Sequence, residues 1–69
     1  MFAVGDITSA RLFYERAADA GDGQAALKLG KTFDPVALYF ARLYGIRGDT
    51  DTAAYWYRRA RDLGAPEAR

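Results

Sequence analysis

The sequence predicts an all-α fold of antiparallel helix hairpins, and two observations lead to this prediction. First, the sequence contains an internal repeat: the segment GDITSARLFYERAADAGDGQA, which begins at Gly5, aligns with GDTDTAAYWYRRARDLGAPEA, which begins at Gly48. Second, apolar residues recur with helical spacing along the chain, and no segment shows the period-two alternation of a half-buried strand. We therefore expect three to four helices, stacked as a fragment of an α-solenoid.

The two copies share one helix face. Within each copy, alanines and aromatic rings fall at i, i+3, i+4 and i+7, and a glycine closes the run. In the first copy these residues are Ala10, Phe13, Tyr14, Ala17 and Gly21, and in the second they are Ala53, Trp56, Tyr57, Ala60 and Gly64. Small alanines let a second helix approach closely while the rings fill the space between, so all ten are predicted to belong to the structural core of the repeat.

The ends of these two runs carry helix-boundary signals. Asp6 and Asp49 each follow a glycine and suit an N-cap or the first helical turn. Gly21 and Gly64 suit the position just after a helix, where a left-handed backbone is common. We expect helices near residues 7–20 and 50–63.

The segment between the copies also has helical spacing. Ala25, Leu29, Gly30 and Phe33 mark a helix over 23–33. Asp34-Pro35 interrupts it, because proline disfavours the α conformation in the preceding residue yet fits the first turn of a new helix. A further helix is expected over 35–44, with Asp34 as its N-cap and Gly45 at its end. Ile46 then supplies one buried aliphatic residue in the connection.

These motifs resemble the Sel-one-like repeat family, a relative of the tetratricopeptide repeats. The first-helix pattern is matched by Ala25, Leu29, Gly30 and Phe33, the loop end by Gly45, Ile46 and Asp49, and the second-helix pattern by Ala53, Trp56, Tyr57, Arg59, Ala60 and Gly64. The resemblance implies that residues 5–21 are the second helix of a preceding repeat and that 23–64 form one full repeat. Residues 65–69 would start a following helix or end the chain.

The spacing between the copies exceeds the usual repeat of this family. We place the excess at about 34–44, as an inserted turn or short helix. Because a repeat buries its apolar face against its neighbours, the ends near Phe2/Ala3 and near Leu63/Ala65 are expected to be open. Three coverings are compatible with the sequence: the rest of a longer chain, a second copy, or the insert folded back.

Possible partner contacts lie off the core stripe. Tyr55 and its equivalent Leu12 would either pack against a neighbouring helix layer or anchor a partner. Arg58 and Arg61 lie mostly on a different face from the rings, and the first copy has Glu15 and Ala18 at these positions. The basic character is therefore not part of the repeat, and a solvated helix face is the favoured interpretation.

Composition argues against several classes of function. The chain has 69 residues, no Cys, no His and a net charge of +1. Thiol and imidazole chemistry are absent, the carboxylates form no convincing acid/base or metal set, and the near-neutral charge gives little reason to expect nucleic acid. We expect no catalytic residue, no cofactor, no metal and no membrane insertion. No signal peptide or transmembrane segment is evident in this chain, although a longer parent chain could be exported.

The function expected from the resemblance is a non-catalytic protein–protein interaction or scaffold module, of the kind common in bacterial signalling and envelope proteins. Self-association at the end of a repeat array is the alternative. A nucleic-acid-contacting basic helix is the third hypothesis, and it alone predicts binding that falls steeply with salt.

Overall fold

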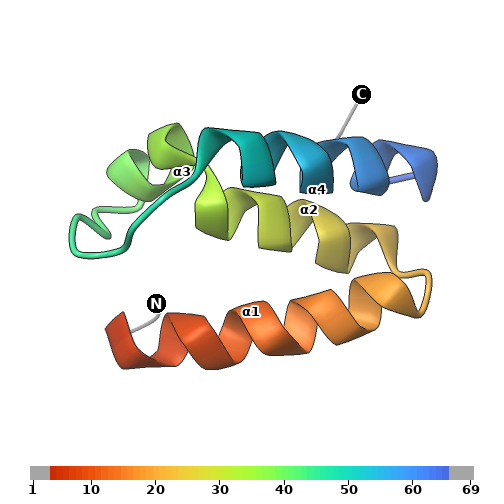
Figure 1. The fold of residues 1–69 in the computed structure, drawn as a ribbon, viewed down its shortest axis with the longest axis horizontal. Helices are drawn as coiled ribbons and strands as arrows, with labels where there is room; N and C mark the ends of the chain where they lie inside the picture. The colour runs from red at the N-terminus through yellow and green to blue at the C-terminus, as the bar shows by residue number, and fades with distance from the viewer. Residues whose placement is uncertain (1–3, 66–69) are drawn as a thin grey trace.

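The computed structural model describes the backbone of residues 4–65 and the side chains of residues 6–65. This part of the chain forms four helices and no strand: α1 (Val4–Asp19), α2 (Gly23–Phe33), α3 (Pro35–Phe40) and α4 (Thr50–Asp62). The predicted all-α class is confirmed. α1, α2 and α4 lie side by side and antiparallel with α2 in the middle, and the short α3 sits at one end (Figure 1).

The central position of α2 explains its composition. It packs against α1 on one side and α4 on the other, whereas α1 and α4 barely touch each other. A helix with two neighbours must bury most of its circumference. Its buried residues are Gly23, Ala25, Ala26, Leu27, Leu29, Gly30 and Thr32.

The main core joins α2 to its two neighbours. Trp56 is its largest member and is 7% exposed, and Leu29 is 1% exposed. Alanines make up most of the rest, which brings the helices close together. The buried residues of this core are Ala18, Ala25, Ala26, Leu27, Leu29, Trp56, Ala60 and Ala65.

Two glycines of α2 allow α4 to approach. A Cβ atom at Gly30 would lie 2.7 Å from Cδ1 of Tyr57, and one at Gly23 would lie 3.1 Å from Cβ of Leu63. The Tyr57 ring therefore lies directly against the Gly30 backbone. This contact gives a physical reason for a glycine in the middle of α2, where helix propensity alone favours alanine.

Aspartates begin three of the helices. Asp22, Asp34 and Asp49 are the N-caps of α2, α3 and α4, and each side chain accepts hydrogen bonds from backbone amides of the first turn. Asp6 lies in the first turn of α1, where the helix dipole favours an acid. α1 and α4 are followed by Gly21 and Gly64 in the left-handed region, at φ +102° and +88°, as their sequence positions predict.

α3 ends earlier than the sequence predicts. It stops at Phe40 rather than continuing to residue 44, so the expectation that Gly45 terminates it is wrong. Arg42 takes the left-handed conformation, with φ +60°. The Arg42 amide donates to the Tyr39 carbonyl and the Leu43 amide to the Leu38 carbonyl. This is the hydrogen-bond pattern of a Schellman motif, closed by arginine at a position that usually holds glycine.

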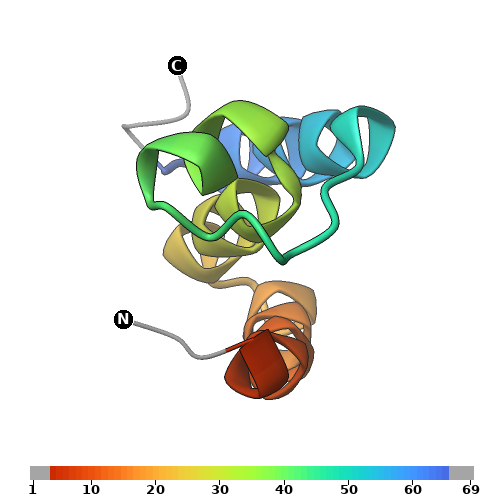
Figure 2. The same ribbon diagram turned by 90° about the vertical axis from the view of Figure 1, so that its left-hand side faces the viewer.

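The insert folds back onto the beginning of α1. Leu38 of α3 forms a second buried cluster with Ile7 of α1 and Ile46 of the connection, and Leu43 packs against it. Figure 2 shows α3 and the loop that follows it in front of the ends of α2 and α4. The expected burial of Ile46 is therefore observed.

Two expectations about the apolar surface differ from the structure. Phe13 is 67% exposed although its repeat equivalent Trp56 is buried. Trp56 packs into the main core, whereas the Phe13 ring forms a T-shaped pair with Tyr14 at its exposed position. The end near Leu63 and Ala65 is not open either, because Leu63 packs on the core and Ala65 is 4% exposed. Phe2, Ala3 and residues 66–69 lie outside the described part of the chain.

Candidate interaction surface

The four residues expected to contact a partner all reach solvent. Leu12 is 48% exposed and Tyr55 50% exposed, and Arg58 and Arg61 are also exposed. The fold does not gather them into one patch. Leu12 is on α1 and the other three are on α4, with α2 between these helices (Figure 1).

The exposed side chain of Tyr55 lies against a residue of its own helix. Its ring stands edge-on against Trp56, with ring centroids 5.0 Å apart. The other half of the side chain is in solvent. Tyr55 is thus held by the core at one edge and free at the other, and a partner ring or aliphatic side chain could meet it without rearrangement.

The arginines of α4 stay largely separate from its buried rings. Within the described residues, Arg58 and Arg61 form no ion pair or hydrogen bond through their side chains. Arg59 is only partly exposed, and its Nε is buried without a partner in the same part of the chain. Neither Arg58 nor Arg61 lines either of the two hollows described below, and we interpret them as a charged helix face.

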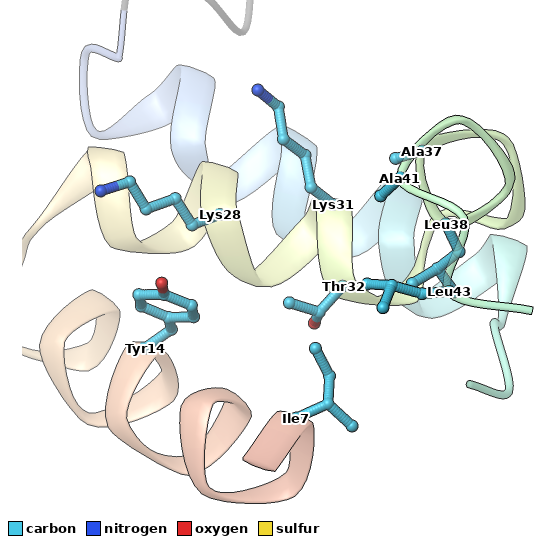
Figure 3. A pocket seen from close by; sticks show the side chains of 9 residues that line it. All are labelled: Ile7, Tyr14, Lys28, Lys31, Thr32, Ala37, Leu38, Ala41 and Leu43. Atoms are coloured by element: carbon cyan, nitrogen blue, oxygen red, sulfur yellow. The ribbon is translucent and has the colours of Figure 1, made fainter. Parts of the chain in front are cut away.

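A groove that the sequence did not predict lies between α1, α2 and α3. It encloses about 270 Å³. Figure 3 shows the side chains that line it converging from the three helices and the turn after α3. Its lining is mostly aliphatic and consists of Ile7, Tyr14, Lys28, Lys31, Thr32, Ala37, Leu38, Ala41 and Leu43.

The two lysines supply the charge of this groove. Lys28 and Lys31 are one turn apart on the exposed side of α2, so their side chains leave the helix in similar directions. Their ammonium groups extend away from the aliphatic floor toward the outside (Figure 3). No carboxylate lines the groove, and neither lysine has an ion pair among the described residues.

Asp34 fixes the corner where α2 gives way to α3. Its Oδ1 accepts a hydrogen bond of 2.9 Å from the Val36 amide, and its Oδ2 accepts one of 2.7 Å from the Tyr57 hydroxyl. One carboxylate thereby ties the start of α3 to α4. Burial, and then the hydrogen bond to Asp34, raises the pKa of Tyr57, so its hydroxyl stays protonated. The aliphatic side chains of α3 are positioned by this corner.

Arg11 ties α1 to α2 and to the loop before α4. Its guanidinium donates to the carbonyl and hydroxyl oxygens of Thr32 and, at 3.1 Å, to the carbonyl of Arg47. The guanidinium carbon also lies 3.8 Å from the centre of the Phe33 ring, in cation–π contact. Partial burial lowers the pKa of Arg11. The side chain links α1 to the end of α2 and to the loop before α4, which is a structural role.

A second hollow, of about 460 Å³, lies beside this arginine, and Phe33, Arg47, Gly48 and Asp49 complete its lining. The side chains of Arg11 and Asp49 in this lining already have partners. The Asp49 carboxylate accepts from the Asp51 and Thr52 amides and from the Thr52 hydroxyl. Hydrogen bonds from the Thr52 hydroxyl and then its amide lower the pKa of Asp49. We therefore regard this hollow as part of the scaffold.

In the described residues, no group of three or more His, Cys, Asp or Glu side chains is placed to hold a metal ion. None of the helices in the same part of the chain is long and apolar enough to cross a membrane.

Sequence reasoning missed the groove because its members belong to different patterns. Ile7 precedes the repeat stripe and Leu43 follows α3, and only the tertiary fold brings them together. The one available signal was the pair Lys28 and Lys31, which are the only lysines of the chain.

Comparison with protein-family models, with curated proteins and with solved structures finds no match to this chain.

Proposed function

We propose that this chain is a non-catalytic binding module of stacked helices that holds a protein partner, as its resemblance to Sel-one-like repeats implies. The observation that carries the proposal is that many large apolar side chains of this small fold are exposed to solvent. The side chains concerned are Leu12, Phe13, Val36, Tyr39, Phe40, Tyr44 and Tyr55, which are 48–78% exposed.

The outer faces of α1 and α4 are left uncovered by the fold. α1 and α4 each pack against α2 on one side only, so their outer faces have no neighbour among the described residues. In stacked-helix proteins such faces meet either another repeat or a bound partner. Exposed aromatic rings are also the residues that most often dominate binding energy at protein interfaces.

Site-specific photo-cross-linking tests the proposal. A photoreactive amino acid replaces Tyr55 in the full chain, and a control carries it at Glu15, an exposed position of α1 on the other side of α2. We expect one protein to be cross-linked from position 55 and not from position 15. Binding of that purified protein should weaken in Tyr55→Ala, whose half-exposed ring should cost less than about 1 kcal/mol of stability. Equal cross-linking from both positions would refute the proposal.

The same partner test separates protein binding from nucleic-acid binding. The double charge reversal Arg58→Glu/Arg61→Glu should leave the protein partner bound. If the chain instead binds RNA or DNA, and that binding falls steeply with salt and disappears in this variant, the basic-helix hypothesis replaces ours.

Self-association is a second candidate, favoured by the rings of the insert. Tyr39 contacts Phe40 and Tyr44 edge-to-face, at centroid distances of 5.6 and 5.8 Å, and all three rings are more than 60% exposed. Light scattering over a hundredfold concentration range tests it. A dimer that Phe40→Ser converts to a monomer would establish this candidate, and a monomer throughout would remove it.

A further inference from the structure

We propose that the groove between α1, α2 and α3 binds an acidic amphipathic peptide segment. Apolar side chains of the segment enter the groove, and its carboxylates pair with Lys28 and Lys31. This inference rests on the proposed function and specifies where the partner binds and what chemistry it presents.

The size of the groove favours side chains over a small-molecule ligand. Pockets for drug-sized molecules and cofactors usually measure about 300–1,000 Å³. At about 270 Å³ this groove is below that range, and it is open along one side rather than enclosed. It matches the anchor side chains of a peptide that continues across the surface on either side.

The chemistry of the lining selects for an apolar anchor. Ile7, Leu38 and Leu43 supply branched aliphatic side chains, and Ala37 and Ala41 leave room beside them. The hydroxyl of Thr32 donates to the Leu29 carbonyl at 2.7 Å and accepts from Arg11, so it is already satisfied. Besides its lysines, the groove therefore offers a ligand the Tyr14 hydroxyl and few other polar groups.

The charge of the rim selects for an acidic flank. Both lysines of the chain line this one groove, whereas all other basic residues are arginines located elsewhere on the sequence. Neither lysine is neutralised within the described residues, and the lining holds no carboxylate. An acidic segment complements this field, and a basic one is repelled by it.

The apolar surface continues past the groove along α1. Tyr14 lines the groove, and the exposed ring of Phe13 meets Tyr14 at a centroid distance of 5.8 Å. This gives the exposed Phe13 a place in the same surface. A bound segment that extends from the groove past Tyr14 would reach it.

The two lysines also make the experiment specific. Reductive methylation with ¹³C gives one signal for each lysine and a separate signal for the terminal amine, and it preserves the positive charge. The probe is a synthetic amphipathic helical peptide with Leu on one face and Glu on the other. Its control replaces every Glu with Gln. We expect both lysine signals to shift and to saturate together with the Glu peptide, and the Gln peptide to bind roughly five- to tenfold more weakly.

Variants with matched charge changes identify the site. Lys28→Glu/Lys31→Glu has no lysine signal, so binding to the variants is measured by fluorescence anisotropy of the labelled peptides. This variant should abolish the preference for the Glu peptide, whereas Arg58→Glu/Arg61→Glu makes the same change of charge on α4 and should retain it. Ala41→Phe fills the groove without removing a buried side chain and should weaken both peptides at least tenfold. Circular dichroism and thermal midpoints verify that each variant is folded.

Three results would overturn the inference: lysine signals that do not shift, equal binding of the two peptides, or equal weakening by the two charge reversals. Each leaves the proposed function intact if position 55 still cross-links to a protein partner. If no protein is cross-linked from position 55 and no peptide binds, both proposals fail.

Discussion

The hydrogen bond from Tyr57 to Asp34 is the contact whose removal gives the sharpest test of how α4 is held. Tyr57→Phe keeps the ring that lies on Gly30 and deletes only the hydroxyl, which donates to Asp34 Oδ2 over 2.7 Å. A hydrogen bond to a charged group contributes about 1.5–3 kcal/mol. Because Tyr57 is only partly buried, we expect the lower end, about 1.5 kcal/mol.

This loss is large for so small a domain. Stability of about 0.05–0.15 kcal/mol per residue gives the 69-residue chain roughly 3–10 kcal/mol in total. A change of 1 kcal/mol moves the melting temperature of such a domain by about 4–8 °C. Tyr57→Phe should therefore melt about 6–12 °C lower, as measured by circular dichroism at pH 7.

The repeat supplies a matched control. Tyr14 occupies the equivalent position in the first copy, and its hydroxyl has no hydrogen-bond partner among the described residues. Tyr14→Phe should change the melting temperature by less than about 2 °C. Asp34→Asn keeps a capping side chain and completes a double-mutant cycle with Tyr57→Phe. Equal effects of the two Tyr→Phe substitutions, or a coupling energy near zero, would refute the reasoning.

The same contact predicts a dependence on alkaline pH. The folded state raises the pKa of Tyr57 through burial and the bond to Asp34, whereas an unfolded tyrosine titrates near 10. The folded chain thus retains a proton that the unfolded chain loses. The stabilising contribution is complete below about pH 10 and is lost as the pH rises further. Urea denaturation at increasing pH should show a steeper decline for the wild type than for Tyr57→Phe.

Four further predictions concern packing, backbone strain and capping. Trp56→Ala should cost about 3–5 kcal/mol, enough to unfold much of the chain, whereas Phe13→Ala should cost no more than about 0.5 kcal/mol; equal losses in urea denaturation would contradict their assigned burial. Gly30→Ala should lose about 1–2 kcal/mol net, since its Cβ would overlap a ring of α4, and a gain would show that the helices can separate freely. Arg42→Gly should raise the free energy of unfolding by up to about 1 kcal/mol, because glycine adopts the left-handed conformation at this position without strain; a lower melting temperature would contradict this. Asp49→Ala should melt lower at pH 7, and because the folded state lowers the pKa of Asp49, the difference from wild type should shrink as the pH falls below about 4.

Local signals in the sequence account for most of the secondary structure. Asp34 followed by Pro35 defines both the end of α2 and the start of α3, and the Asp49 cap and the closing Gly64 bound α4. These signals act within one turn of the chain, so they can be recognised without knowing the fold. They fail at Arg42, where contact between Leu38 and Leu43 favours an early helix end that no glycine marks.

The periodic pattern of alanines and rings predicted the buried face of α4, where Ala53, Trp56 and Ala60 are buried. It did not predict the most buried residues of α1, which are Ile7 and Ala18 and lie outside the pattern. Phe13 and Trp56 hold the same position in the repeat, and only one of them is buried. The difference depends on the neighbours that each ring meets. The Trp56 ring enters the alanine-rich core, whereas the Phe13 ring stays outside that core and pairs with Tyr14.

The sequence by itself determined the helical class, the caps at Asp34 and Asp49 and the buried face of α4. Each of these follows from interactions between residues close together in the chain. The groove was decided by the tertiary structure alone. It requires α3 to fold back so that Leu38 meets Ile7 beside Lys28 and Lys31, and no local spacing encodes that meeting.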